Sequence, residues 1–321
     1  MSPLQEAAQT VLRDCMGIKQ DEITLVLTDE PCHKIGRALY EVGKSFCNEI
    51  FILEIVPRRI NGEEPPAEIA ELMKSVDVII APLSKSITHT DARRNACKAG
   101  TRVGTMPGIT EEIMIRTMRA DYNRISRLTD KITEILSNGE VAHLTTALGS
   151  DLRIPIKGIQ AISSSGLVKN AGKFGNLPSG ESYLMPEEGK AQGVYYVDGS
   201  LAGVGLISDG PVEITVENGI AVSITGGKDA EKFTEMVDEV GNSARNLAEL
   251  GVGTNYMAQI NGTVLEDEKV LGTIHLALGN NVSMGGTVNV GFHVDGIITK
   301  PTLKIDDLLL LDNGEMQIEE N

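Results

Sequence analysis

The first 140 residues alternate short aliphatic runs with amphipathic segments. Continuous aliphatic runs predict buried strands at Ile23–Asp29, 49–56 and 76–83, and a fourth strand beginning at Thr101. The amphipathic segments predict helices at residues 32–47, 66–74, 91–99 and 110–136, the last one broken near Asp121. Such alternation indicates a parallel sheet joined by right-handed crossovers. We therefore expect an α/β domain with a Rossmann-like parallel sheet over residues 1–140, which serves as a scaffold.

The second half has a different pattern. Residues 141–321 hold 26 of the 34 glycines, and β-rich segments there are separated by Gly, Asn and Asp turns. Asn218-Gly219 between two aliphatic runs predicts a hairpin. One helix is expected at residues 229–250. We therefore predict a β-rich α+β domain over residues 141–321, with the boundary near residue 140.

Composition narrows the classes of function. Acidic residues outnumber basic ones 45 to 29, so the net charge is −16. This charge excludes nucleic acid and anionic membrane surfaces as partners, because both require a basic face. The four cysteines form no C-x-x-C pair, and neither a signal peptide nor an apolar run of membrane-spanning length is evident. We expect a cytoplasmic enzyme with reduced thiols.

Nucleotide binding is disfavoured. The turn after the first strand reads Thr28-Asp29-Glu30-Pro31 and contains no G-x-G-x-x-G motif. Its acidic residues would repel a pyrophosphate. The sequence therefore predicts no nucleotide cofactor.

Histidines and acids in the second half form a candidate metal site. His293 and Asp295 are two apart in a predicted strand, so they share a face and can begin a metal site, although a hydrogen-bonded pair at a strand edge is the simpler alternative. His275 lies in an apolar run, where a core histidine is the alternative. Glu181, in a Pro-Gly turn, and Glu249, where the predicted helix ends, can each also be solvated. Together the five can hold two divalent ions.

Several ordered sequence blocks carry a family resemblance. THTDARRNACKAGTRVGTMPGIT (residues 88–110) is followed in order by NLPSGE, RNLAELGVGTN, LEDEKVLGTIHLALG and GFHVDG. Over nearly its full length the chain resembles the metallo-aminopeptidases of the aminopeptidase T and aminopeptidase S type. The resemblance implies a hydrolase that removes N-terminal residues from a small peptide or amide substrate, and it implies a homodimer.

The same resemblance implies a set of metal ligands. By motif, these ligands are Glu181, Glu249, His275, His293 and Asp295. They would hold two divalent ions, zinc, cobalt, manganese or magnesium, which activate a water molecule. If Glu181 is not a ligand, it is a candidate general base. Asp267 and Glu268 are expected to begin a helix rather than to take part in the site.

Other features favour an alternative. The peptidases have a tyrosine shortly after the first metal histidine, where this chain has Val282. The tail HVDGIITKPTLKIDDLLLLDNGE resembles a divergent branch that includes the 2,5-dihydroxypyridine ring-opening dioxygenases, which hold one iron(II) by two histidines and an aspartate. His293 and Asp295 fit two of those places, whereas Glu249 stands near the third. The sequence favours an aminopeptidase and leaves open an iron(II) dioxygenase of hydroxylated pyridines or a non-catalytic metal-binding protein of the same superfamily.

Overall fold

The chain folds into two compact units. The computed structural model describes residues 1–318. One unit comprises Met1–Ser126 and Gly166–Ser179, and the other comprises Arg127–Ser165 and the chain from Gly180 onward. The division therefore falls within helix α6 (Tyr122–Asn138) rather than near residue 140, and one short segment returns to the first unit. The predicted mixed α/β fold class is confirmed, with one parallel sheet and two antiparallel sheets.

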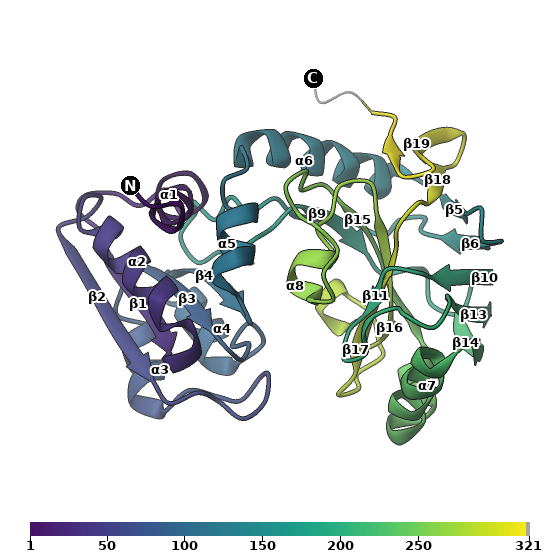
Figure 1. The fold of residues 1–321 in the computed structure, drawn as a ribbon, viewed down its shortest axis with the longest axis horizontal. Helices are drawn as coiled ribbons and strands as arrows, with labels where there is room; N and C mark the ends of the chain where they lie inside the picture. Colours follow the sequence, from purple (N-terminus) through teal and green to yellow (C-terminus); the bar gives the residue numbers. More distant parts are fainter. Residues whose placement is uncertain (319–321) are drawn as a thin grey trace. The chain divides into compact units, whose positions relative to one another are not determined.

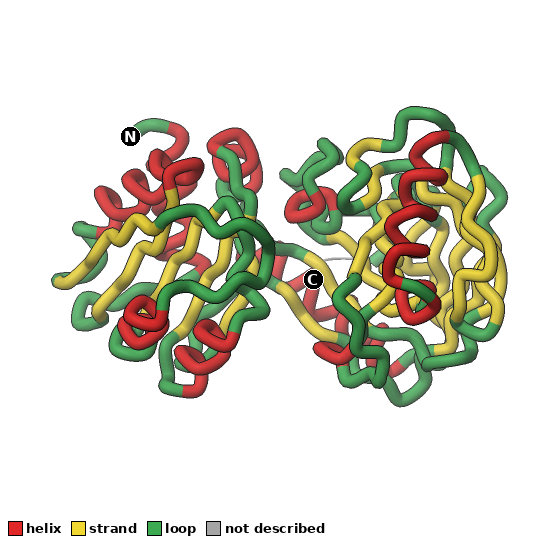
Figure 2. The backbone as a smooth tube through the Cα atoms, turned by 90° about the horizontal axis from the view of Figure 1, so that it is seen from below, coloured by secondary structure: helices red, strands yellow, loops and turns green. Residues whose placement is uncertain are grey.

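The first unit is built on a five-stranded parallel sheet with the order β2-β1-β3-β4-β8. Its strands are β1 (Ile23–Asp29), β2 (Glu49–Ile55), β3 (Val78–Leu83), β4 (Arg102–Pro107) and β8 (Phe174–Asn176). All six residues of β3 are buried, as expected for a strand covered on both faces. The strands predicted in this half are confirmed, and the crossover helices lie on both faces of the sheet (Figure 2).

The helices of this unit begin where short polar side chains can cap them. Thr90 accepts a hydrogen bond from the backbone N–H of Arg93, and Thr110 accepts one from that of Ile113. The helical elements are α1 (Pro3–Thr10), η1 (Val11–Cys15), η2 (Glu30–Cys32), α2 (His33–Gly43), α3 (Ala67–Met73), α4 (Asp91–Lys98) and α5 (Glu111–Thr117). The break predicted near Asp121 separates α5 from α6.

The second unit contains two antiparallel sheets. The eight-stranded sheet has the order β14-β13-β10-β6-β5-β18-β19-β20, and the seven-stranded sheet has the order β12-β11-β17-β16-β15-β9-β7 (Figure 1). The strands of the first sheet are β5 (Val141–Thr145), β6 (Asp151–Pro155), β10 (Gln192–Val197), β13 (Val212–Glu217), β14 (Ile220–Thr225), β18 (Thr302–Ile305), β19 (Leu308–Asp312) and β20 (Glu315–Met316). Those of the second are β7 (Ile162–Ser164), β9 (Glu181–Leu184), β11 (Ser200–Leu201), β12 (Gly205–Leu206), β15 (Leu247–Gly253), β16 (Ile274–Gly279) and β17 (His293–Ile298).

A single hydrophobic core joins the two sheets of this unit. Leu152 and Ile214 from the eight-stranded sheet belong to the same buried cluster as Leu250 and Leu276 from the seven-stranded sheet. Helix α6 and helix α7 (Lys228–Val240) add apolar side chains to the cluster. The remaining helical elements are η3 (Asn242–Arg245), α8 (Val264–Asp267) and η4 (Val282–Met284). The core thus supports the seven-stranded sheet from one side.

Two local predictions in this unit have different outcomes. The hairpin at Asn218-Gly219 is confirmed: it joins β13 to β14, and both residues have positive φ values, 49° and 74°. The helix expected at residues 229–250 is wrong beyond Val240, because Gly241, at φ 94°, ends α7. Residues 247–250 instead form part of β15, where pairing with β9 and β16 outweighs helix propensity.

Over residues 1–318, none of the helices has both the length and the apolar character needed to cross a bilayer.

Truncation of Leu276 tests the contribution of the shared core. Its side chain is 1% exposed between the sheets, so Leu276→Ala should lower the free energy of unfolding by about 2–5 kcal/mol. Leu308→Ala is the matched control, since Leu308 is 47% exposed and should change this free energy by less than about 0.5 kcal/mol. Urea unfolding followed by far-ultraviolet circular dichroism measures both. Equal losses in the two variants would contradict this description of the core.

Candidate metal centre

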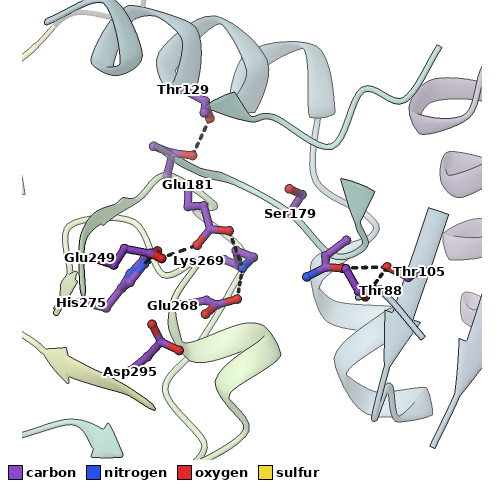
Figure 3. Close-up of polar contacts among 12 residues, drawn as sticks. Thr88, Thr105, Thr129, Ser179, Glu181, Glu249, Glu268, Lys269, His275 and Asp295 are labelled. Atoms are coloured by element: carbon purple, nitrogen blue, oxygen red, sulfur yellow. Dashed lines mark hydrogen bonds and ion pairs between the residues drawn. The ribbon is translucent and has the colours of Figure 1, made fainter. Parts of the chain in front are cut away.

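One face of the seven-stranded sheet carries a cluster of charged side chains. Along β15, β16 and β17, alternate residues such as Leu250, Leu276 and Val294 point into the core. The positions between them point to the opposite face, as does the first residue of β9. The residues predicted from the sequence lie there together, namely Glu181, Glu249, His275, His293 and Asp295. Figure 3 shows four of them, Glu181, Glu249, His275 and Asp295. Strand alternation and neighbouring strands therefore bring these five side chains to one place.

Small residues make room for the cluster. Gly251 lies directly opposite His275 in the β15–β16 pair, and a Cβ atom at Gly251 would stand 2.0 Å from His275 Nε2. Ala277 on β16 lies between Glu249 on β15 and Asp295 on β17. Gly251 and Ala277 therefore leave space above the middle of the sheet, and the imidazole of His275 fits into this space.

Glu249, His293 and Asp295 form the first compact group of donor atoms. His293 Nε2 lies 3.4 Å from Glu249 Oε2 and 3.6 Å from Asp295 Oδ1. One ligand atom from each residue lies within 4.8 Å of the others. Metal–nitrogen and metal–oxygen bonds are about 2.0–2.2 Å, so ligand atoms on opposite sides of one ion stand about 4.0–4.4 Å apart. The group has dimensions that suit a single divalent ion.

The imidazole of His293 is held by the loop that precedes its strand. His293 Nδ1 bonds to the carbonyl oxygen of Asn280 at 2.8 Å, so Nδ1 is the donor and Nε2 faces the two carboxylates. Glu188 closes this loop, because it accepts hydrogen bonds from Asn281 Nδ2 at 2.8 Å and from Thr287 N and Oγ1, each at 2.7 Å. A ligating histidine with its second nitrogen bonded to a carbonyl is the common arrangement at metal sites.

The charges of this first group are strongly coupled. Burial alone would lower the pKa of His293, but Asp295 and Glu249 raise it well above its ordinary value. Burial alone would raise the pKa of Asp295, but His293 and His275 lower it to about 2. The pKa of Glu249 is also lowered, by hydrogen bonds from His275 and His293 that outweigh burial. Both carboxylates are therefore ionised, and they stabilise the protonated imidazole of His293.

Glu181, Glu268 and His275 form a second group, and a lysine lies in it. Lys269 is fully buried, and its Nζ lies 2.8 Å from Glu181 Oε1 and also contacts Glu268 Oε1. His275 Nε2 lies 3.6 Å from Glu181 Oε2 and 3.2 Å from Glu249 Oε1, so this ring stands between the two groups. The ligand atoms of Glu181, Glu268 and His275 also lie within 4.8 Å of one another.

Burial and charge act against each other in the second group as well. Burial lowers the pKa of His275, yet its bond to Glu249 and the charge of Glu181 raise it to about 9. Burial raises the pKa of Glu268 to about 8, although the Lys269 ammonium opposes this change. Within residues 1–318, His275 Nδ1 is buried and has no hydrogen-bond partner. The imidazole of His275 thus makes its polar contacts through Nε2, toward the carboxylates.

Several positions differ from the sequence-based expectations. Glu181 begins strand β9 instead of lying in a turn, and Glu249 lies within strand β15 instead of at a helix end. The expected helix start at Asp267 and Glu268 is wrong, because α8 ends at Asp267 and Glu268 follows it. Val282, the position at which the peptidases have a tyrosine, is 46% exposed in η4.

Sequence reasoning missed the roles of Glu268 and Lys269. Both lie in the quoted block LEDEKVLGTIHLALG, seven and six residues before His275, respectively. The sequence feature that could have indicated them is Lys269 itself, which follows the acidic run 266–268 and precedes the buried strand β16. Asp267, by contrast, has a structural role, since it accepts hydrogen bonds from Ser200 Oγ, Asn261 N and Gly262 N.

Comparisons with known sequences give one consistent family. The model of the family described as 2,5-dihydroxypyridine 5,6-dioxygenase (NicX) matches residues 58–318. A curated 2,5-dihydroxypyridine 5,6-dioxygenase from Pseudomonas putida (strain KT2440) is 20% identical over 261 residues, which cover 76% of this chain and 72% of that protein.

Solved structures share the fold. A 2,5-dihydroxypyridine dioxygenase from Pseudomonas putida KT2440 superimposes with a TM-score of 0.85 at 17% identity, covering 100% of this chain and 99% of that one. Wild-type AmpT from Thermus thermophilus superimposes with a TM-score of 0.70 at 17% identity, covering 98% and 99% of the two chains. At these identities the likeness concerns the fold alone.

The comparisons correct the functional expectation. The aminopeptidase interpretation, and with it the assignment to hydrolases and proteases, is wrong, because the family match and the curated relative both carry the dioxygenase name. The likeness to AmpT concerns the fold and does not make this chain a peptidase. The matched range covers more than half of the chain and includes all five predicted ligands. The chain belongs to the 2,5-dihydroxypyridine 5,6-dioxygenase (NicX) family.

Proposed function

We propose that the chain is a metal-dependent dioxygenase that opens the ring of a hydroxylated pyridine. In this proposal, Glu249, His293 and Asp295 hold a single iron(II) ion. Family membership supports the reaction class, and the curated relative is named for the 5,6-cleavage of 2,5-dihydroxypyridine. The donor set supports the metal, since imidazole together with carboxylate oxygens suits iron(II).

One observation carries the proposal. His293 Nε2 lies 3.4 Å from an oxygen of Glu249 and 3.6 Å from an oxygen of Asp295, while its Nδ1 is bonded to the carbonyl oxygen of Asn280. Three donor atoms thus lie close enough together to bind one cation, which supports the proposal. Two ionised carboxylates and a neutral imidazole balance the charge of a divalent ion, which lowers the cost of burying them together.

The chemistry of dioxygen depends on the metal. Iron(II), when bound, supplies the redox capacity that lets dioxygen react with a closed-shell aromatic ring. The reaction class adds both atoms of dioxygen to the ring and breaks one ring bond, so no external reductant is needed.

The side chains of this chain position the donors. Asn280 orients the imidazole of His293 through its carbonyl oxygen. His275 Nε2 donates to Glu249 Oε1 at 3.2 Å and so leaves Glu249 Oε2 directed at His293. Each carboxylate of the group therefore has a fixed oxygen available for the ion, as preorganised sites require.

Most of the solvent exposure of the group lies at His293. Glu249 and Asp295 are 8% and 7% exposed, whereas 34% of the His293 side chain is exposed. Because these carboxylates are buried, little bulk water reaches their oxygens, and their attraction to a cation is correspondingly stronger. Dioxygen and an aromatic substrate would approach on the His293 side.

The proposal is tested by oxygen consumption. Protein loaded anaerobically with iron(II) should consume one dioxygen per molecule of 2,5-dihydroxypyridine, and both atoms of ¹⁸O-labelled dioxygen should appear in the product. An oxygen electrode and mass spectrometry measure these results. If fully iron-loaded protein consumes no dioxygen with any hydroxylated pyridine, the proposal fails.

Removal of the histidine ligand should abolish the activity. His293→Ala deletes Nε2, and we expect iron affinity and oxygen uptake to fall by about 100-fold or more, since loss of a supporting partner alone costs about 10–100-fold. His143→Ala is the matched control: His143 is also paired with a carboxylate, Asp151 at 2.7 Å, but it lies in β5 of the other sheet. Retained iron in His293→Ala, measured after dialysis, would contradict this ligand assignment.

A methyl group at Gly251 should displace His275. Gly251→Ala places a Cβ atom against the imidazole, which then cannot keep its bond to Glu249. We expect iron affinity to fall by about 10-fold or more, with the far-ultraviolet circular dichroism spectrum retained. Gly291→Ala is the control, because a Cβ atom there meets open space. Equal iron affinity in the two variants would show that the position of His275 does not matter to the ion.

A further inference from the structure

Lys269 is held rigidly in the interior beside the proposed iron ligands. The residue is 0% exposed, and its backbone N–H donates to the carbonyl oxygen of Glu266 at 2.9 Å. Its own carbonyl oxygen accepts from the backbone N–H of Asn255 at 2.8 Å. Lysine is rarely buried unless its charge is paired. The fold therefore fixes the backbone of Lys269 on both sides, and its ammonium must find partners in the interior.

The partners of this ammonium are carboxylates that are otherwise arranged for a metal ion. Lys269 Nζ lies 2.8 Å from Glu181 Oε1 and also contacts Glu268 Oε1 (Figure 3). The ligand atoms of Glu181, Glu268 and His275 lie within 4.8 Å of one another, which is close enough for one ion. The ammonium group of Lys269 therefore already supplies a positive charge within this group of ligand atoms.

A second metal ion would have to compete with this ammonium. Two-metal sites hold their ions about 3.5–4 Å apart and require the carboxylates of both groups. An ion among Glu181, Glu268 and His275 would meet the positive charge of Lys269 Nζ within a few ångströms, and the side chain of Lys269 is fully buried. Repulsion between unscreened charges at such a distance amounts to several kcal/mol.

We propose that the Lys269 ammonium takes the place of a second cation and restricts the centre to one ion. That ion lies at Glu249, His293 and Asp295, so the inference builds on the proposed function. Glu181 then serves to neutralise Lys269 and is neither a ligand nor a base. The chain retains all five residues of the two-ion pattern, but Lys269 occupies the group that a second ion would need.

The number of ions per chain tests this inference directly. Wild-type protein, Lys269→Met and Lys269→Gln are equilibrated with excess Mn²⁺ in the absence of oxygen, and bound metal is measured by equilibrium dialysis with mass spectrometry. We expect one Mn²⁺ per chain in the wild type and two in either uncharged variant, whose electron paramagnetic resonance spectra should show two spin-coupled ions. Lys304→Met is the matched control, because Lys304 is exposed on β18; it should retain one ion.

Each outcome decides the inference. Two Mn²⁺ ions in the wild type, or one ion in a folded Lys269→Met or Lys269→Gln variant, overturns it. Lys269→Gln can still donate a hydrogen bond to Glu181, so it serves if Lys269→Met does not fold, and the wild-type count decides even if neither variant folds. The proposed function fails separately. If the wild type binds one ion but consumes no oxygen, the dioxygenase proposal is refuted and the role of Lys269 stands. If it binds two ions and consumes oxygen, the role of Lys269 is refuted and the dioxygenase proposal stands.

Discussion

Compensation of buried negative charge is the constraint on which this site depends. Four acidic side chains, those of Glu181, Glu249, Glu268 and Asp295, gather at one face of one sheet, and each is at most 15% exposed. Isolated ionised carboxylates cannot remain in such surroundings, because the loss of hydration costs several kcal/mol for each. In the structure, the Lys269 ammonium and the imidazoles of His275 and His293 face these carboxylates and supply the compensating positive charge. The position of every group in the centre follows from this requirement.

The two faces of the seven-stranded sheet have opposite character, since one is apolar and the other carries charged residues. Its core side is a continuous layer of aliphatic residues, including Leu250 and Leu276, packed against the other sheet of the same unit. Its other side alternates charged residues with the small residues Gly251 and Ala277. A strand can do this because successive side chains point to opposite faces. The apolar layer resists distortion of the backbone, and the charged side chains on the other face remain where the strands hold them.

Local patterns in the sequence were sufficient for most of the fold and for part of the site. Strand–helix alternation predicted the first unit, and the two-residue spacing of His293 and Asp295 predicted their common face. Helix propensity failed beyond Val240, because pairing of β15 with strands distant in sequence determines the structure there. The contact between Lys269 and Glu181 joins residues 88 positions apart, so no local pattern reveals it. The five candidate ligands were visible in the sequence, but the buried ammonium that pairs with Glu181 was not.

The hydrogen bonds of Glu188 have a consequence for the thermodynamics of ligation. Glu188 closes the loop that leads to His293, and the first residues of that loop fix the ring through the carbonyl oxygen of Asn280. The conformational entropy of this segment is therefore lost when the protein folds, before any ion arrives. Ion binding then requires little further ordering of the backbone, so more of the intrinsic bond strength is expressed as affinity. Glu188, which lies outside the candidate ligand set, would thus contribute to how tightly the proposed ion is held.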